Sequence, residues 1–174
     1  MPPAVIAILV FAPMAVEALL AARNERHQRA RGGVEPRGDV YKLMRVAYPG
    51  AFLAMIAEAS AREHPATPWV AAGLACFGLA KALKWWAMAA LGRFWTFRVI
   101  VIPGATLVAR GPYRFLRHPN YVGVVLELLG VALMAHAAVS GPLVIVLFGV
   151  LLARRIRVEN RALDSTARHP PCSL

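Results

Sequence analysis

Near its N-terminus the chain contains the apolar run PPAVIAILVFAPMAVEALLAA (residues 2–22), which is interrupted only by Pro13 and Glu17. A helix that crosses a membrane needs about 20 mainly apolar residues, and this run is long enough. A secretory signal peptide is the alternative, but no basic residue precedes the run and no convincing cleavage site follows it before Arg23. We therefore expect a retained membrane-spanning helix here.

Four further apolar runs follow along the chain. They cover residues 43–61, 69–91, 119–137 and 142–153. After Ala153 the last run continues as a basic helix to Arg161. We therefore predict an all-α integral membrane protein with five transmembrane helices. We expect one domain over residues 1–174, made of two N-terminal helices, a core and a tail (residues 1–68, 69–165 and 166–174).

The composition supports a membrane protein. Of the 174 residues, 59% are hydrophobic and 17% are charged, and the mean hydropathy is +0.54. A soluble domain usually has more charge, and a disordered chain needs low hydrophobicity. The net charge of +11 would also suit a nucleic-acid-binding protein. However, long apolar runs separate the basic clusters, so we expect a membrane surface as the partner and no nucleic acid.

The basic residues predict how the helices are oriented. Most of them lie in three segments, residues 23–42, residues 92–118 and the tail after residue 153. The other two connections, 62–68 and 138–141, contain Arg62 alone. Five helices place these two sets on opposite sides of the membrane. The positive-inside rule then puts the N-terminus outside and the C-terminus in the cytoplasm.

Charged residues also lie inside the predicted spans. We expect Lys81 and Lys84 to snorkel toward lipid headgroups, beside Trp85 and Trp86 as interface anchors.

Three acids lie in the spans as well, and a carboxylate inside a bilayer is costly and usually faces the bundle interior. Glu17 belongs to the first span, and Glu58 lies near a span end, where it can reach water. Glu127 lies two turns beyond His118 and Pro119, so it is either a substrate-pocket group or part of a structural hydrogen bond.

The segment GRFWTFRVIVIPGATLVARGPYRFLRHPNYVG (residues 92–123) is unusually polar for a connection between apolar helices. Residues 99–102 and 106–108 favour β-structure with a Pro103-Gly104 turn between them, and Pro119 suits the first turn of a helix. Non-helical backbone near a membrane is tolerated where it lines a cavity. The segment is therefore a candidate site, and a surface loop that contacts lipid phosphates is the alternative.

A second polar group lies at the end of the fifth apolar run. Arg155 and Glu159 are four residues apart and share one face of a helix, which is also the spacing of a routine surface ion pair. The five histidines are scattered, and a metal site would need clustered ligands, so we expect no metal.

Three motifs give the chain a resemblance to a known family. They are Gly111-Pro112-Tyr113, Arg117-His118-Pro119-Asn120-Tyr121 with Gly123, and Arg155-x-x-x-Glu159-Asn160-x-x-Leu163. This pattern resembles the isoprenylcysteine carboxyl methyltransferase family, integral membrane enzymes that use S-adenosylmethionine, over roughly residues 70–165. Residues 82–86 and 92–96 are similar to a bacterial branch that methylates alkylpyrones or alkylresorcinols.

The resemblance implies a cytoplasmic cofactor pocket, built from the loop between helices three and four and from the hairpin of helices four and five. The implied cofactor-binding residues are Thr106, Leu107, Val108, Tyr113, His118, Pro119, Asn120, Tyr121 and Glu159. Arg155 matches the catalytic arginine that faces the reacting oxygen of the substrate, and Glu127 is a further candidate for substrate binding. The sequence departs from the family pattern at Arg98, Ala105 and Asn160, where relatives often carry glutamine, histidine and a second glutamate.

We therefore expect methyl transfer from S-adenosylmethionine to the oxygen of a lipophilic carboxylate or acidic enol, with an alkylpyrone or alkylresorcinol as one candidate acceptor. An acceptor that is already ionised needs no strong general base, which suits a site without an obvious one. The alternatives are a phospholipid amine methyltransferase and a non-catalytic membrane scaffold or lipid-binding protein. An arginine beside the acceptor argues against an amine, and the scaffold predicts no cofactor binding.

Overall fold

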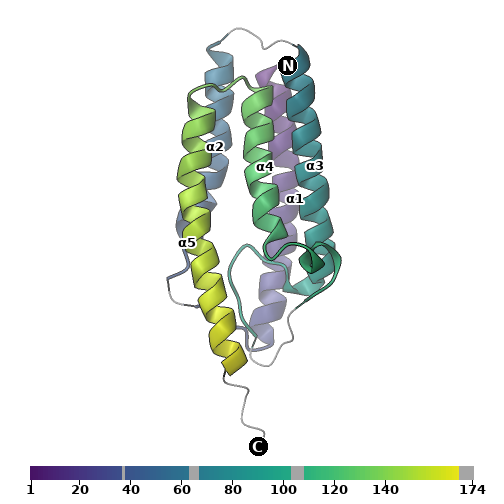
Figure 1. Cartoon of the computed structure of the whole chain (residues 1–174), viewed down its shortest axis with the longest axis vertical. Helices are drawn as coiled ribbons and strands as arrows, with labels where there is room; N and C mark the ends of the chain where they lie inside the picture. The colour runs from purple at the N-terminus through teal and green to yellow at the C-terminus, as the bar shows by residue number, and fades with distance from the viewer. Residues whose placement is uncertain (37, 63–66, 103–107, 169–174) are drawn as a thin grey trace, which may run out of the picture.

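Five long helices form the bundle shown in the computed structural model of the chain (Figure 1). The structure describes residues 1–36, 38–62, 67–102 and 108–168. The helices are α1 (Pro3–Ala30), α2 (Tyr41–Ser60), α3 (Thr67–Leu91), α4 (Pro119–Met134) and α5 (Ser140–Arg168), and two short 3₁₀ helices are η1 (Gly92–Phe94) and η2 (Gly111–Arg114). No strand occurs in the described residues, so the all-α prediction is confirmed there.

The helices alternate in direction along the bundle axis (Figure 1). The N-terminus, the end of α2, the start of α3 and the α4–α5 turn lie at one end of the bundle. The described parts of the α1–α2 and α3–α4 connections lie at the opposite end, together with the basic half of α5. We call this opposite end the basic end, because it contains the three arginine-rich segments of the sequence.

Within the described residues, two helical segments are long and apolar enough to cross a membrane by length and composition: Pro3–Ala30 and Pro68–Phe94. Helix α4 is apolar but has 16 residues, which extend about 24 Å, against a hydrocarbon core of about 30 Å. The first half of α5 is apolar and its second half is basic. The helix count of the prediction is thus confirmed, and the spanning of all five helices stays a prediction.

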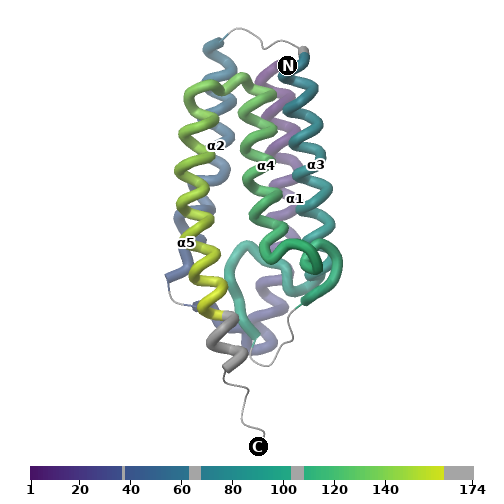
Figure 2. The backbone as a smooth tube through the Cα atoms, viewed as in Figure 1, coloured from purple at the N-terminus to yellow at the C-terminus, as the bar shows by residue number. Residues whose placement is uncertain are grey.

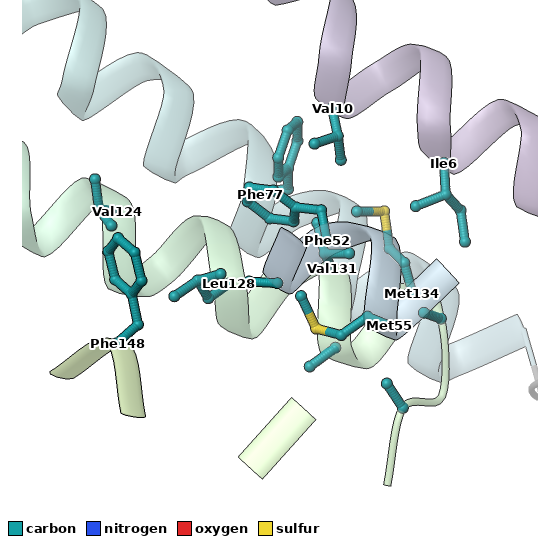
Figure 3. Close-up of a cluster of buried hydrophobic side chains, with 14 of the residues drawn as sticks. Ile6, Val10, Phe52, Met55, Phe77, Val124, Leu128, Val131, Met134 and Phe148 are labelled. Atoms are coloured by element: carbon teal, nitrogen blue, oxygen red, sulfur yellow. The ribbon is translucent and has the colours of Figure 1, made fainter. Parts of the chain in front are cut away.

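The hydrophobic core lies between the helices and draws on all five of them. Figure 3 shows Ile6 and Val10 from α1 close to Phe52 and Met55 from α2 and Phe77 from α3. The core also includes four residues of α4 and Phe148 of α5; the α4 residues are Val124, Leu128, Val131 and Met134. Large apolar side chains also face outward, including Ile8, Leu19, Leu79 and Val146. Helices that are apolar on both their inner and outer faces are typical of a lipid environment.

Glycines let α3 and α4 approach each other closely. A Cβ atom at Gly73 would lie 2.6 Å from the backbone nitrogen of Met134, and one at Gly130 would lie 2.8 Å from that of Phe77. These distances are too short for any larger residue to fit without a shift of backbone. The two helices are therefore closely packed near the start of α3 and the end of α4, toward the end of the bundle opposite the basic end.

Helix α1 extends about two turns beyond the predicted end at residue 22, and this extension organises the basic end. The side-chain amide of Asn24 donates to the carbonyl oxygens of Gly92 and Trp95 at 3.1 and 2.8 Å. The side-chain amide of Gln28 donates to the carbonyl oxygen of Arg93 at 3.0 Å. These bonds fix η1 and the loop that follows it against α1. Both belong to the α3–α4 connection, which Figure 2 shows at the basic end.

The β-favouring stretch of residues 99–102 pairs with the α1–α2 connection at a single position. Residues 99–102 form no strand, and Val101 instead makes an isolated antiparallel bridge to Val34. The nitrogen of Val34 donates to the oxygen of Val101 at 2.9 Å, and the return bond is 3.0 Å. The backbone N–H of Val99 donates to a carboxylate oxygen of Asp39 at 3.2 Å, so the α1–α2 connection supplies partners for both Val99 and Val101. Residues 103–107, with the predicted turn, lie outside the described residues.

Glu58 fixes the opposite end of the bundle. Its carboxylate accepts hydrogen bonds from the backbone N–H groups of Val139 and Ser140 and from the Ser140 hydroxyl, at 3.1, 2.7 and 2.6 Å. These are unpaired donors at the start of α5, which a carboxylate stabilises. The sequence indicates only that Glu58 can reach water. The structure shows in addition that this residue of α2 caps the start of α5.

Candidate functional site

A cavity of about 340 Å³ lies at the basic end, between α1, α2, α4, α5 and the loop that follows η1. Two segments far apart in the sequence supply its polar wall, the start of α4 and the second half of α5. Six residues singled out from the sequence line it: Tyr113, His118, Asn120, Tyr121, Arg155 and Glu159. The structure therefore brings residues of all three sequence motifs together around one cavity, and the two that supply most of them are the motif at the start of α4 and the motif in α5.

Helix α4 begins at Pro119, as predicted, and this start places its neighbours in the cavity wall. Proline is well suited to the first helical turn because its missing N–H has no partner there in any case. The rings of His118 and Tyr121 stack with centroids 5.5 Å apart, and the side chain of Asn120 accepts a hydrogen bond of 3.3 Å from the indole of Trp95. Pro119 itself is buried and does not line the cavity.

Tyr121 connects the two motifs directly. Its hydroxyl donates to the Glu159 carboxylate at 2.6 Å and accepts from the Arg155 Nε at 2.9 Å. The Nδ1 atom of His118 lies 3.9 Å from the same carboxylate. Burial raises the pKa of the nearby Tyr113 phenol well above its usual range, and the negative charge of Glu159 raises it further. Tyr113 is therefore a protonated phenol throughout the physiological pH range.

Arg155 is 5% exposed and is surrounded by acceptors. Its Nη1 lies 3.2 Å from the Asp39 carboxylate, its Nη2 donates to the carbonyl oxygen of Phe97, and its Nε is bound to Tyr121 as above. A guanidinium has five N–H groups, and one on Nη2 remains without a partner among the residues that the structure describes. Arg155 thus holds the loop, α2 and α4 together and can offer one further hydrogen bond.

The other charged residues of the cavity wall differ in how they are paired. Lys84 is fully buried between two acids, and Arg98 lies 3.1 Å from Glu25 and 2.9 Å from Glu35. Glu159 has no lysine or arginine within ion-pair distance in the described parts of the chain. Its carboxylate is therefore a net negative charge in the wall, beside aromatic rings and a buried His118 Nε2 atom that lacks a described hydrogen-bond partner.

The prediction that Lys81 and Lys84 snorkel toward headgroups is wrong. Both are buried, at 9% and 1% exposure, in a cluster with Glu17 and Glu127. Lys81 lies 2.9 and 3.0 Å from these two acids, and Lys84 lies 2.6 and 3.3 Å from them. Two bases and two acids cancel each other's charge, which makes their burial far less costly than that of an isolated ion.

Glu127 belongs to this cluster and not to the cavity wall. It is 1% exposed, and the hydroxyl of Tyr48 donates to its carboxylate. This placement favours the structural alternative over direct contact with a substrate. Trp85 and Trp86 are half exposed, and the indole of Trp85 donates to Glu17 at 3.3 Å; their role as interface anchors stays a prediction.

The remaining predicted cofactor residues are placed less completely. Thr106 and Leu107 lie outside the described residues, and Val108 is half-buried and does not line the cavity. No group of histidine, cysteine or acidic side chains suited to a metal ion occurs in the described part of the chain.

Sequence reasoning missed the contribution of the N-terminal third. Asp39 and five residues of α2 border the site; the α2 residues are Tyr41, Met44, Arg45, Tyr48 and Pro49. Their spacing of three and four residues is the signature of one helix face. Asp39 is one of three acids in the basic segment 23–42, and nothing in the sequence identifies its partner 116 residues later.

The chain is similar in sequence to several known proteins. The chain is 35% identical to uncharacterized protein YpbQ of Bacillus subtilis (strain 168) over 161 aligned residues. The aligned region covers 91% of this chain and 94% of that protein. The chain is 24% identical to an uncharacterized protein of Haemophilus influenzae over 146 aligned residues, which are 83% of this chain and 85% of that protein. It is also 35% identical over 81 residues to cobalt-zinc-cadmium resistance protein CzcN of Cupriavidus metallidurans, covering 45% of this chain and 37% of that protein.

No solved structure matches the chain significantly. The model of one protein family matches residues 72–165, more than half of the chain. This range contains α4, most of α3 and α5, and the motifs of the cavity wall. The chain therefore belongs to the isoprenylcysteine carboxyl methyltransferase family, a family of membrane methyltransferases.

Proposed function

We propose that this chain is an S-adenosylmethionine-dependent O-methyltransferase that acts on a lipophilic carboxylate or acidic enol at the membrane. The observation that carries the proposal is the Glu159 carboxylate, a negative charge without a lysine or arginine partner in the described wall of a cavity. Membership of the family supports the reaction class. The alkylpyrone or alkylresorcinol acceptor suggested by the resemblance stays a narrower prediction.

The residues of the cavity fit a cationic nucleoside cofactor. S-adenosylmethionine, when bound, supplies an electrophilic methyl group on a positively charged sulfur. Glu159 would balance that positive charge, and the rings of Tyr113 and Tyr121 offer π-faces that attract a cation. The unpartnered Nε2 atom of His118 would bond a polar group of the cofactor.

The acceptor must present an oxygen nucleophile in line with the methyl group, at close range. We propose that Arg155 orients this oxygen through its one remaining N–H group. A single contact to the non-attacking oxygen of the acceptor would leave the attacking oxygen nucleophilic, whereas a bidentate pair would hold both. Asp39 and Phe97 occupy the other side of the guanidinium and favour this single contact.

Most of the residues that line the cavity are apolar or aromatic, including Met14, Phe148 and Leu152. Charge is neutralised when an anion attacks a sulfonium, so a water-poor surrounding favours the transition state over the separated ions. The same apolar residues would accommodate the hydrocarbon part of the acceptor.

We further propose that all five helices are embedded in the membrane with the basic end, and hence the site, in the cytoplasm and the N-terminus outside. The arginine-rich connections that meet at the basic end support this orientation by the positive-inside rule. The outward-facing apolar residues of the helices support the embedding.

Two measurements test the proposal. Purified full-length chain in lipid nanodiscs should bind radiolabelled S-adenosylmethionine, and unlabelled S-adenosylhomocysteine should compete. The lipid extract of cells that contain the chain should hold an oxygen-methylated lipid, one CH₂ heavier than its precursor, that is missing from cells without it. Absence of cofactor binding would favour the scaffold, and a methylated amine headgroup as the only product would favour the phospholipid alternative.

A further inference from the structure

Arg45 on α2 is the cation of the cavity wall that the described structure leaves without an acid. Four arginine or lysine side chains line the cavity: Arg45, Lys84, Arg98 and Arg155. The last three are each within 3.3 Å of a carboxylate. Arg45 makes no ion pair within residues 1–36, 38–62, 68–102 and 108–162, where side chains are described, and it is exposed at the cavity edge.

The pairing of Arg155 limits how strongly it attracts an anion. Asp39 is 3% exposed and lies 3.2 Å from the guanidinium, so the two charges largely cancel. The same holds for Lys84, which two buried glutamates neutralise. An anionic acceptor that enters this cavity therefore gains little net Coulomb attraction from either side chain. Another positive charge is needed to select it over a neutral lipid.

Helix α2 places Arg45 where such a selection can occur. The cavity-lining residues Tyr41, Met44, Arg45 and Tyr48 follow the spacing of one helix face. Met44, next to Arg45, has its sulfur 4.0 Å from Arg155 Nη1. One turn further into the bundle, the ring of Tyr48 packs on Phe148 with centroids 5.2 Å apart. The cavity wall formed by α2 therefore has the unpaired Arg45 at its edge and the aromatic ring of Tyr48 deeper in the bundle.

We infer that Arg45 is the specificity-determining residue that recognises the anionic group of the acceptor, with the hydrocarbon tail lying toward Tyr48 and Phe148. The inference rests on the proposed function, and it narrows the acceptor to amphiphiles that carry a carboxylate or a comparable oxyanion next to an apolar chain. Residue 45 lies outside the matched range 72–165, so the N-terminal part of the chain supplies this selection.

The test uses full-length chain in phosphatidylcholine nanodiscs and two photoreactive probes, a diazirine-bearing hexadecanoic acid and the matching hexadecanol. The parent protein should be labelled by the acid in preference to the alcohol by about tenfold, the usual effect of one charge-assisted hydrogen bond. Arg45→Gln should bring this ratio close to one, and Arg45→Lys should restore part of it. Lys42→Gln is the matched control, since it removes one exposed charge from the same turn of α2 and should leave the ratio unchanged.

Binding of S-adenosylhomocysteine is measured on the same samples and should be equal in the parent and in Arg45→Gln. An acid preference that survives Arg45→Gln, or that is missing from the parent, would overturn the inference while leaving the proposed function intact. Loss of the preference in phosphatidylglycerol nanodiscs would assign Arg45 to lipid phosphates and also overturn it. Failure of the parent to bind S-adenosylhomocysteine would instead count against the proposed function.

Discussion

The carboxylate of Asp39 and the guanidinium of Arg155, 116 residues apart in the sequence, form a buried ion pair of 3.2 Å. Their side chains are 3% and 6% exposed. Asp39 also accepts hydrogen bonds from the backbone N–H groups of Tyr41 and Val99, at 3.1 and 3.2 Å. One carboxylate therefore joins the start of α2, the α3–α4 connection and α5 around the cavity.

Removal of both partners of this pair should destabilise the protein by less than the sum of the two single removals. We expect Asp39→Ala to lower the free energy of unfolding by about 3–5 kcal/mol, because it leaves the Arg155 charge buried without compensation. In the double variant with Arg155→Ala, the loss should be clearly smaller than the sum of the two single losses. Thermal unfolding of the four proteins in nanodiscs measures the difference, and additive effects would contradict a direct pair.

The charge of Glu159 should govern the affinity for the cofactor. In Glu159→Gln the side chain keeps an acceptor for the Tyr121 hydroxyl but loses its negative charge. We therefore expect the Kd for S-adenosylmethionine to rise about tenfold or more. Glu35→Gln is the control, since Glu35 is a carboxylate at the same end that does not line the cavity. Equilibrium dialysis with labelled cofactor gives both values, and equal affinities would remove Glu159 from the binding site.

The stability of the protein should depend on the balance of positive and negative charges in the buried cluster of Lys81, Lys84, Glu17 and Glu127. Lys84→Met leaves Glu17 and Glu127 with Lys81 alone, and we expect a loss of about 3–5 kcal/mol in the free energy of unfolding. A second change, Glu127→Gln, restores neutrality and should recover part of this loss. The exposed Lys42→Met should change stability by less than about 0.5 kcal/mol. Unfolding midpoints rank the variants, and a double variant less stable than Lys84→Met would contradict charge balance.

The close contact of α3 with α4 should be sensitive to a single methyl group. Gly130→Ala places a Cβ 2.8 Å from the nitrogen of Phe77, and we expect it to destabilise the fold by about 1–3 kcal/mol. Gly78→Ala is the matched control on α3, because its Cβ meets nothing within 4 Å. Alanine is a better helix former than glycine, so this variant should be neutral or stabilised by up to about 1 kcal/mol. Equal melting temperatures for the two variants would refute the steric argument.

The sequence predicts the helices well because their signals are local. Runs of apolar residues locate all five helices, and Pro119 locates the start of α4 to the residue. The pair formed by Arg155 and Glu159 is also local, since a spacing of four residues fixes a common face. The two motifs meet in one cavity because α4 and α5 are consecutive and antiparallel, as a helical hairpin requires.

The errors concern partners that are distant in the sequence. The lysines at positions 81 and 84 look like snorkelling residues on their own helix, and the acids that neutralise them lie on α1 and α4. Likewise, Val101 has β-propensity, but its bridge partner is Val34, which belongs to a segment counted only for its basic residues. Periodicity and propensity report what one segment prefers, whereas these contacts depend on which segment it meets.

Because Glu17 precedes Lys81 by 64 residues, the ribosome synthesises Glu17 well before Lys81 or Lys84, the two lysines that it pairs with. A nascent chain that ends before α3 therefore carries an apolar helix whose carboxylate has no lysine of this cluster to meet. Such a helix is poorly suited to stay alone in lipid. Under the proposed membrane embedding, the order of synthesis thus favours delayed or joint integration of the first and third helices.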